Sequence, residues 1–180
     1  MADDAGCLEL HLLALAAIDV EAVTALVNAA FSRHPIMTGD RTSPEGLAEE
    51  AGAAAEFLQL TRGSTLVGTA MIKPAATAGA EDRELWARSG QTLDDALYFG
   101  LAAVDSAETG SGVGKRLVAE AEAIARDRGY RRVILGTVRE FGLVEYYSRL
   151  GYITFRQQTF AAGHWGIRVP HQYHDMVREL

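Results

Sequence analysis

The sequence has little cysteine, no excess of basic residues and no long apolar run. Cys7 is the one cysteine among 180 residues, which excludes an internal disulfide framework. It stands where a first strand is expected to begin, so we expect it to be buried rather than reactive. No apolar run reaches the roughly 20 residues of a membrane-spanning helix, and residues 1–4 are acidic where a secretory leader would be basic. The sequence therefore predicts a cytoplasmic protein without a membrane partner.

The excess of charge is acidic. The chain has 17 Lys and Arg against 24 Asp and Glu, a formal net charge of −7. A protein that binds nucleic acid regardless of sequence needs a basic face to neutralise phosphates. This composition therefore argues against a nucleic-acid partner.

The length and the 48% hydrophobic content allow one ordinary hydrophobic core. We expect a single domain of the α/β class with four segments along the chain. These are a strand, two helices and a hairpin (1–74), a loop insertion (75–95), a central core (96–158), and a C-terminal loop and strand (159–180).

Apolar periodicity and turn residues place the elements of the first half. Asp19 is a candidate cap for a helix whose apolar residues recur at helical spacing, and Ser43-Pro44-Glu45 has the order of cap, first-position proline and first-turn acid. The stretch from Ala75 to Leu93 lacks periodicity and predicts a long loop. The expected elements are a strand at Leu8–Leu12, a helix from Asp19 to about Phe31, a helix from Pro44 to about Ala55, and a hairpin of Phe57–Thr61 and Thr65–Lys73.

In the second half, an almost uninterrupted apolar run at Ala96–Val104 predicts a central strand covered on both faces. An amphipathic helix is expected from Val113 to Gly129. The elements expected after it are a strand at Arg132–Val138, a helix at Phe141–Leu150, a strand at Tyr152–Phe155 and a last strand near Tyr173–Leu180.

The most informative stretch is the glycine loop, Thr109 to Lys115, which joins the central strand to the amphipathic helix. Glycine lets the backbone approach a ligand closely, and the unpaired amides of the helix start favour an anion such as phosphate. The dinucleotide-binding pattern does not fit, because Lys115 stands where its third glycine belongs. The P-loop pattern does not fit, because Arg116 replaces Ser or Thr and Thr109 replaces the leading glycine.

The loop resembles the acetyl-CoA pyrophosphate loop of the GNAT family of N-acetyltransferases. That pattern is Gln or Arg, two residues, Gly, one residue, then Gly or Ala, and here it runs from Thr109 to Gly114 with Thr in the first place. The resemblance extends to 104–105, 131–135 and 146–152. It implies a mixed, largely antiparallel sheet of about six or seven strands, flanked by about four helices, in which a splayed pair of strands holds the cofactor.

The resemblance implies that acetyl-CoA is the cosubstrate, and we expect no metal. Backbone groups of Ala102 and Val104 match the positions that pair with the amide-bearing arm of the cofactor. Glu140 stands where many relatives have an Asn that contacts this arm. The pyrophosphate would rest on the glycine loop, residues Thr109, Gly110, Ser111, Gly112, Val113, Gly114 and Lys115.

Tyr147 lies in the pattern Tyr-x-x-x-Gly-aromatic, which is similar to the proton donor of the family. A thiol has a pKa of about 8.5 and a phenol about 10, so donation to a departing thiolate is feasible without large tuning. The alternative is a packed helix tyrosine. The resemblance implies direct attack of a primary amine on the thioester.

The sequence gives weaker signals for the residues that would bind the amine acceptor. Arg41 is a candidate to pair with an acceptor carboxylate, or else belongs to a turn stabilised by Asp40. Tyr98, Phe160, Trp165 and Tyr173 are candidates to wall an apolar acceptor pocket, or are core. His171 and His174 would face opposite ways on a strand, which argues against a metal site. The candidate general bases are Glu45, Glu49, Glu50, Asp94, Asp95 and His164.

Two other functions remain open. A catalytically silent CoA-binding sensor or interaction module would explain Thr109 and Glu140, whereas Tyr147 argues for an enzyme. A phosphotransferase would require magnesium-dependent ATP binding, and the sequence lacks a recognisable acidic metal-binding set. The acceptor is a small molecule or peptide with an amine, and the acidic composition favours a cationic one. Homodimers are common in the family that the chain resembles, so a homodimer is also expected.

Overall fold

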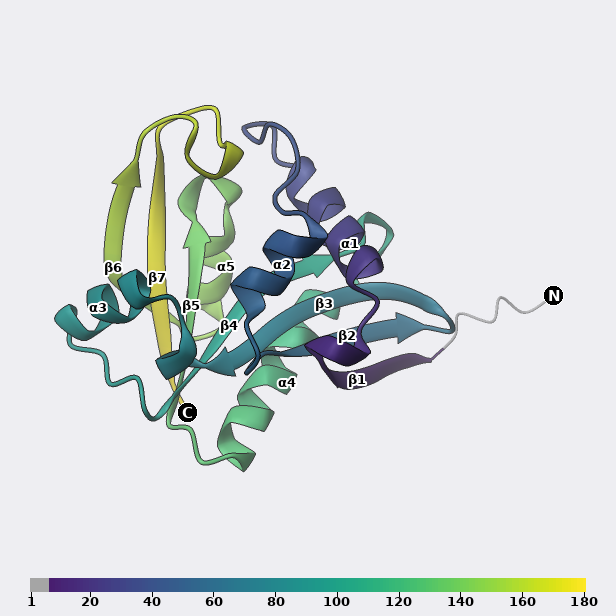
Figure 1. Ribbon diagram of the computed structural model, residues 1–180, viewed down its shortest axis with the longest axis horizontal. Coiled ribbons are helices and arrows are strands. Elements are labelled where there is room, and N and C mark those ends of the chain that lie inside the picture. Colours follow the sequence, from purple (N-terminus) through teal and green to yellow (C-terminus); the bar gives the residue numbers. More distant parts are fainter. Residues whose placement is uncertain (1–6) are drawn as a thin grey trace.

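A computed structural model describes residues 7–180 and contains one mixed seven-stranded sheet (Figure 1). The strand order is β1-β2-β3-β4-β5-β7-β6, and every neighbouring pair is antiparallel except β4 and β5. The predicted fold class is confirmed. The strands are β1 (Leu8–Ala14), β2 (Glu56–Arg62), β3 (Thr65–Pro74), β4 (Ala96–Val104), β5 (Arg132–Val138), β6 (Ile153–Phe160) and β7 (His171–Glu179).

Helices cover both faces of the sheet, with α4 and α5 behind it and α1, α2 and α3 in front in Figure 1. Alternate residues of the strands supply two cores. Leu58 and Ile72 pack with α4, while their neighbours Phe57 and Met71 pack with α1 and α2. Within residues 7–180 the α-helices are α1 (Val20–Ser32), α2 (Pro44–Ala51), α3 (Ala80–Arg88), α4 (Val113–Asp127) and α5 (Leu143–Arg149).

The predicted starts of the first two helices are confirmed by their caps. The Asp19 carboxylate accepts the Ala22 N–H at 3.0 Å, and the Ser43 hydroxyl accepts the Gly46 N–H at 3.1 Å. Helix α2 ends at Ala51 rather than near Ala55, because Gly52 takes a φ of +68° that ends the helical path.

The prediction of a long loop at 75–93 is wrong, because this stretch contains α3. A single buried side chain, Trp86, attaches the helix to the sheet. Its Nε1–H donates to Asp175 on β7 at 3.0 Å, and Arg156 on β6 donates to the same carboxylate at 2.6 Å. A helix that buries one residue leaves no apolar stripe in the sequence, which is why its periodicity is missing.

Other boundaries differ from the prediction. The predicted helix at Phe141–Leu150 is divided by Gly142, whose φ of +74° separates the 3₁₀ turn η4 (Arg139–Phe141) from α5. Strand β6 runs on to Phe160, because it pairs with β7 along its whole length. Cys7 is exposed, so the expectation that it is buried is wrong.

A bulge in β4 changes which way its side chains point. Met71 pairs with Gly100 and Thr69 pairs with Ala103, so the partner strand β3 advances by fewer residues than β4. Leu101, inside the bulge, has a φ of +47°. Phe99 packs in the core on the α4 side, whereas Leu101 and Ala103 pack against α1 and α2. The bulge therefore reverses the alternation of β4.

Strands β4 and β5 separate at the same level. Their parallel pairing runs from Ala96 and Arg132 to Phe99 and Leu135, and both strands continue beyond it. Gly136, the next residue of β5, leaves room for a side chain of β7. A Cβ on Gly136 would lie 1.8 Å from the Tyr173 hydroxyl oxygen. The splayed pair that the sequence predicts is thus present.

We predict that Gly136→Ala destabilises the protein by about 1–3 kcal/mol, because Tyr173 would have to leave its packed position. The matched control is Gly79→Ala, whose Cβ would meet its first neighbour, Asp82 Oδ2, at an ordinary 3.6 Å. Urea unfolding of both variants measures the difference. Equal stability of the two variants would show that the Tyr173 side chain does not need the space beside Gly136.

Candidate active site

A cavity of about 680 Å³ lies beside the end of β4, beyond the last residue that pairs with β5. Four parts of the chain surround it: the end of β4, the glycine loop with the start of α4, the α5 region, and the end of α1. The lining residues are Ala30, Phe31, Arg33, His34, Phe99, Ala102, Ala103, Val104, Glu108, Thr109, Gly110, Gly112, Gly114, Lys115, Leu117, Val118, Phe141, Leu143, Tyr146 and Tyr147. Most of these side chains are apolar, as in many cofactor sites.

The end of β4 presents backbone groups to this cavity. The Asp105 N–H donates to Val67 O at 2.9 Å, which makes Gly68 and Val104 a non-hydrogen-bonded pair of the antiparallel ladder. The N–H and C=O of Val104 therefore point away from β3, toward the side that β5 has left. The C=O accepts a hydrogen bond from Arg33 Nη2 at 2.8 Å. Its N–H is directed to the cavity side, where an extended amide-bearing ligand would pair with it.

The glycine loop has the geometry of an anion site. Gly110 and Gly112 have φ values of +81° and +92°, and a Cβ on either would meet nothing within 4 Å. Gly112 is the N-cap of the 15-residue helix α4 and supplies no side-chain acceptor. The amides of the first helical turn thus have no acceptor within the helix and carry its positive dipole end. This arrangement favours phosphate oxygens at the loop.

Charges near the loop also favour an anion. Glu108 lines the cavity, but Arg62 Nε donates to its carboxylate at 2.8 Å. Hydrogen bonds from Arg62 and then Ser111 lower the pKa of Glu108. The ion pair with Arg62 offsets the repulsion that this carboxylate would exert on an anion. Lys115 and Arg33 are the cationic side chains of the lining.

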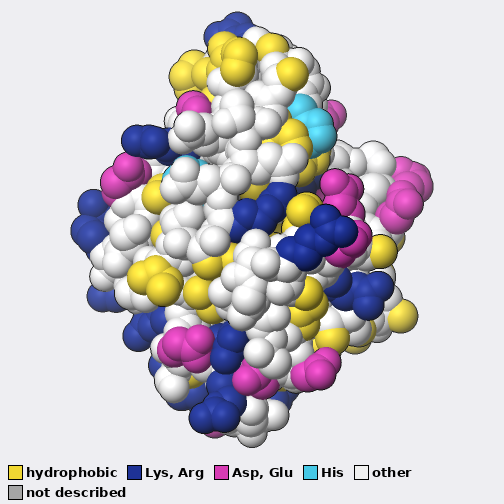
Figure 2. Space-filling view, turned by 90° about the vertical axis from the view of Figure 1, so that its left-hand side faces the viewer, with side chains coloured by type: hydrophobic (Ala, Val, Ile, Leu, Met, Phe, Trp, Pro, Cys, Tyr) yellow, Lys and Arg dark blue, Asp and Glu magenta, His cyan; other side chains and the backbone are white. Residues whose placement is uncertain are grey.

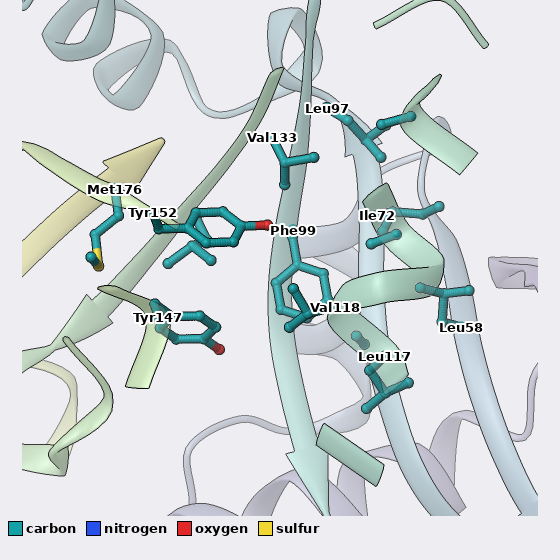
Figure 3. Packing of buried hydrophobic residues seen from close by; sticks show 14 of the residues in the cluster. Leu58, Ile72, Leu97, Phe99, Leu117, Val118, Val133, Tyr147, Tyr152 and Met176 are labelled. Atoms are coloured by element: carbon teal, nitrogen blue, oxygen red, sulfur yellow. The ribbon is translucent and has the colours of Figure 1, made fainter. Parts of the chain in front are cut away.

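Tyr147 of α5 lines the cavity together with Leu117 and Val118 of α4. Its side chain is almost completely buried, and burial raises the pKa of its phenol well above the usual value, with the neighbouring Tyr146 adding to the effect. Figure 3 shows its hydroxyl on the side of the ring nearer Phe99 and Val118, which also line the cavity. Within residues 7–180 this hydroxyl has no hydrogen-bond partner. Tyr147 therefore presents a protonated phenol to the cavity.

Tyr152 shows what a structural tyrosine looks like in the same core. Its ring packs edge-on against Tyr147 at 5.8 Å, but its hydroxyl donates to the buried Glu122 at 3.2 Å. Glu122 also accepts a hydrogen bond from Arg178 at 2.8 Å. Tyr152 is thus held inside a polar network away from the cavity.

The C-terminal end of α1 is a part of the lining that the sequence did not predict. His34 stacks on Phe141 of η4 with ring centroids 4.0 Å apart, and Phe31 meets the same ring edge-on at 5.9 Å. Burial, and then the charge of Arg33, lower the pKa of His34, so its imidazole is uncharged at pH 7. The only sequence signal for a place in the cavity lining is an aromatic side chain and two basic side chains at a helix end, within residues 31–34.

Most of the predicted cofactor residues lie together around the cavity, and three do not line it. Ser111 donates its hydroxyl to Glu108 O at 2.7 Å, and Val113 is buried beneath the loop. The Glu140 carboxylate accepts the Gln172 N–H at 3.1 and 3.2 Å, so it joins η4 to β7. Ala102, Val104, Thr109, Gly110, Gly112, Gly114 and Lys115 all line the cavity.

The predicted acceptor residues Arg41 and Tyr98 both lie outside the cavity lining. Arg41 pairs with Glu50 at 3.1 Å rather than with Asp40, and its guanidinium lies 5.8 Å from the centre of the Phe31 ring. Tyr98 packs on Trp86, and burial raises the pKa of its phenol strongly. Neither lines the cavity, although Phe31 links Arg41 to it.

Three of the four predicted wall residues, Phe160, Trp165 and Tyr173, form a cluster at the tip of β6 and β7, whereas Tyr98 does not belong to it. Phe160 stacks on His164 at 4.1 Å and lies 4.7 Å from Trp165, which is 43% exposed. The tip is joined to the α1–α2 loop by a Thr38 N–H bond to Gly166 O at 2.7 Å. Figure 2 shows hydrophobic side chains gathered at the top of the molecule, where this tip lies in Figure 1.

None of the predicted general bases (Glu45, Glu49, Glu50, Asp94, Asp95 and His164) lines the cavity. Among residues 7–180 there is no group of three or more His, Cys, Asp or Glu side chains placed to hold a metal ion. In the same part of the chain no helix combines the length and the apolar character that a membrane span requires.

Comparison with known families gives one match. The sequence model of the acetyltransferase (GNAT) family matches residues 23–152. This range contains most of α1, the splayed strands, the glycine loop and Tyr147. No curated protein matches the chain significantly.

Many solved structures share the fold. A Streptococcus mutans protein superposes with a TM-score of 0.71 at 16% identity, covering 95% of this chain and 98% of its own. A Staphylococcus aureus N-acetyltransferase superposes with a TM-score of 0.69 at 10% identity, covering 97% of this chain and 99% of its own. A Bacillus cereus IAA acetyltransferase superposes with a TM-score of 0.65 at 16% identity, covering 97% of this chain and 100% of its own. At these identities the similarity shows the fold alone.

The lowered pKa of His34 predicts a pH dependence of stability. Below the ordinary His pKa of 6.5 the unfolded chain takes up a proton that the folded chain resists. The stabilisation is therefore present above pH 6.5 and lost as pH falls through the folded pKa. We expect the thermal midpoint to fall from pH 7 to pH 5 less steeply in His34→Gln than in the wild type. Identical slopes in the two proteins would contradict the burial of a neutral imidazole.

Proposed function

The chain belongs to the acetyltransferase (GNAT) family, and on that premise we propose that it transfers an acetyl group from acetyl-CoA to a primary amine. The observation that carries the proposal is the joint position of the glycine loop, the free edge of β4 and Tyr147 around one cavity. These three features correspond to an anion site, a backbone edge for an amide-bearing arm, and a proton donor. A pure CoA sensor would need the first two and not the third.

The residues of the cavity fit an acetyl-CoA cosubstrate. The amides at Val113 and Gly114 and the side chain of Lys115 would hold its diphosphate. The Val104 N–H on the free edge of β4 would pair with its amide-bearing arm, while Leu117 and Val118 give the arm an apolar wall. When bound, the cosubstrate supplies a thioester carbonyl to the attacking amine and a thiolate as the leaving group.

Tyr147 is the proposed general acid. Its raised pKa keeps the phenol protonated throughout the physiological range, so it always holds a proton to donate. Its position among apolar side chains keeps competing water away from the O–H. Direct attack of the amine requires no covalent acyl-enzyme, and among the lining residues there is no cysteine or serine nucleophile.

The acceptor class that we propose is a small molecule or peptide with a primary amine. The sheet opens between β4 and β5, and the α1–α2 loop and the β6–β7 tip lie together at the end of the molecule nearest this opening (Figure 1). The exposed indole of Trp165 on the β6–β7 tip favours an acceptor that has apolar surface beside its amine. We also propose that the protein acts in the cytoplasm.

We predict that Tyr147→Phe lowers kcat about 100-fold or more, while the Kd for acetyl-CoA stays nearly unchanged. Activity is measured as CoA thiol release over a panel of amines, with acetyl-CoA and amine each omitted in turn. The matched control is Tyr152→Phe, which removes a hydroxyl that bonds Glu122 outside the cavity and should lower stability but not kcat.

Two results would go against this proposal. Equal kcat in wild type and Tyr147→Phe would remove Tyr147 from the mechanism. Tight acetyl-CoA binding without thiol release for any amine class would favour the catalytically silent sensor instead.

A further inference from the structure

The glycine loop lacks the side chain that opens the pattern it resembles. Thr109 stands in the place of Gln or Arg, and its short hydroxyl carries no charge. An anion at the loop would then have the backbone amides and Lys115 but no second cationic or amide side chain from the loop itself. The structure shows a guanidinium from elsewhere in the chain at this place.

Arg33, the C-cap residue of α1, contacts the end of β4 and the first residue of the glycine loop. Its Nη2 donates to Val104 O at 2.8 Å, and its Nη1 lies 3.4 Å from the Thr109 hydroxyl oxygen as a donor. Its Nε donates to Ala30 O at 3.3 Å. The side chain is therefore fixed at the strand end just before the loop and beside the position that the pattern reserves for a polar side chain.

The geometry of Arg33 leaves binding capacity unused. A guanidinium has five N–H donors, and three of them have the acceptors given above. Within residues 7–180 the other two have none. Because Arg33 lines the cavity together with Gly110, Gly112 and Lys115, these donors belong to the same site as the amides of the helix start.

We propose that Arg33 binds the diphosphate of the acyl donor and replaces the side chain that is missing at Thr109. This inference rests on the proposed function. Arg33 donates one guanidinium N–H to the end of β4 and presents its remaining N–H groups to phosphate oxygens, which a planar guanidinium binds well. With Lys115 it opposes the negative charge of a diphosphate, while Arg62 neutralises the nearby Glu108.

The alternative is that Arg33 only ties α1 to β4. The two roles differ in what they predict for a donor without phosphates. If Arg33 only joins α1 to β4, its loss should weaken the binding of every ligand of the cavity. If Arg33 binds the diphosphate, its loss should weaken only ligands that contain a diphosphate. The comparison of acetyl-CoA with S-acetylpantetheine, which lacks the nucleotide and the diphosphate, separates them.

The test is calorimetric titration of wild type, Arg33→Ala, and Arg33→Ala combined with Thr109→Arg. We expect Arg33→Ala to weaken acetyl-CoA binding roughly 10- to 100-fold, as for the loss of a hydrogen bond to a charged group. Binding of S-acetylpantetheine, measured by direct titration at millimolar concentration, should not change. Thr109→Arg in the same chain should restore most of the affinity for acetyl-CoA.

Arg116→Ala is the matched control, because it removes the same charge close to the loop. Its guanidinium donates to Leu8 O at 2.9 Å on the far side of α4, so acetyl-CoA affinity should change little. Thermal midpoints of all variants identify any loss of folding.

Unchanged acetyl-CoA binding in Arg33→Ala, or an equal loss for both ligands without rescue by Thr109→Arg, would overturn the inference. A wild-type protein that binds neither ligand would refute the proposed function itself, which is a distinguishable result.

Discussion

The structure depends on the point at which β4 and β5 stop pairing. Up to Phe99 and Leu135 the two strands share hydrogen bonds, and beyond it each pairs only with its other neighbour. The bulge at Leu101 turns the end of β4, so that Ala102 and Val104 line the cavity with Phe99. A sheet with continuous pairing would have no free edge there, and the loop after β4 would not meet Tyr147.

The two halves of the fold meet at this opening. Strands β1 to β4 bring the glycine loop and α4, and the elements after β5 bring Phe141 and Tyr147. Helix α1 lies between them, because Arg33 bonds the end of β4 and His34 stacks on Phe141. The cavity is therefore closed by contacts among segments that are far apart in the sequence, and its shape depends on all of them.

The sequence predicted best what local patterns encode. Strands β4 and β5 have the predicted bounds, because buried strands give continuous apolar runs. The sequence also predicts the N-terminal cap of α1 and the position of the glycine loop. Helix α3 was missed because only Trp86 is buried. The bulge was missed because Leu101, with its φ of +47°, lies inside an ordinary strand-forming run. Arg33 and His34 join the site only through tertiary packing, which no local spacing reveals.

Calorimetric titration of the wild-type protein with acetyl-CoA, with ATP and NADH as comparison ligands, tests the central claim most directly. The claim is that the cavity beside the end of β4 holds an acyl donor with its diphosphate on the glycine loop. It predicts saturable binding of acetyl-CoA and much weaker or undetectable binding of the other two. No binding of acetyl-CoA at millimolar concentration, or tighter binding of ATP or NADH, would contradict it.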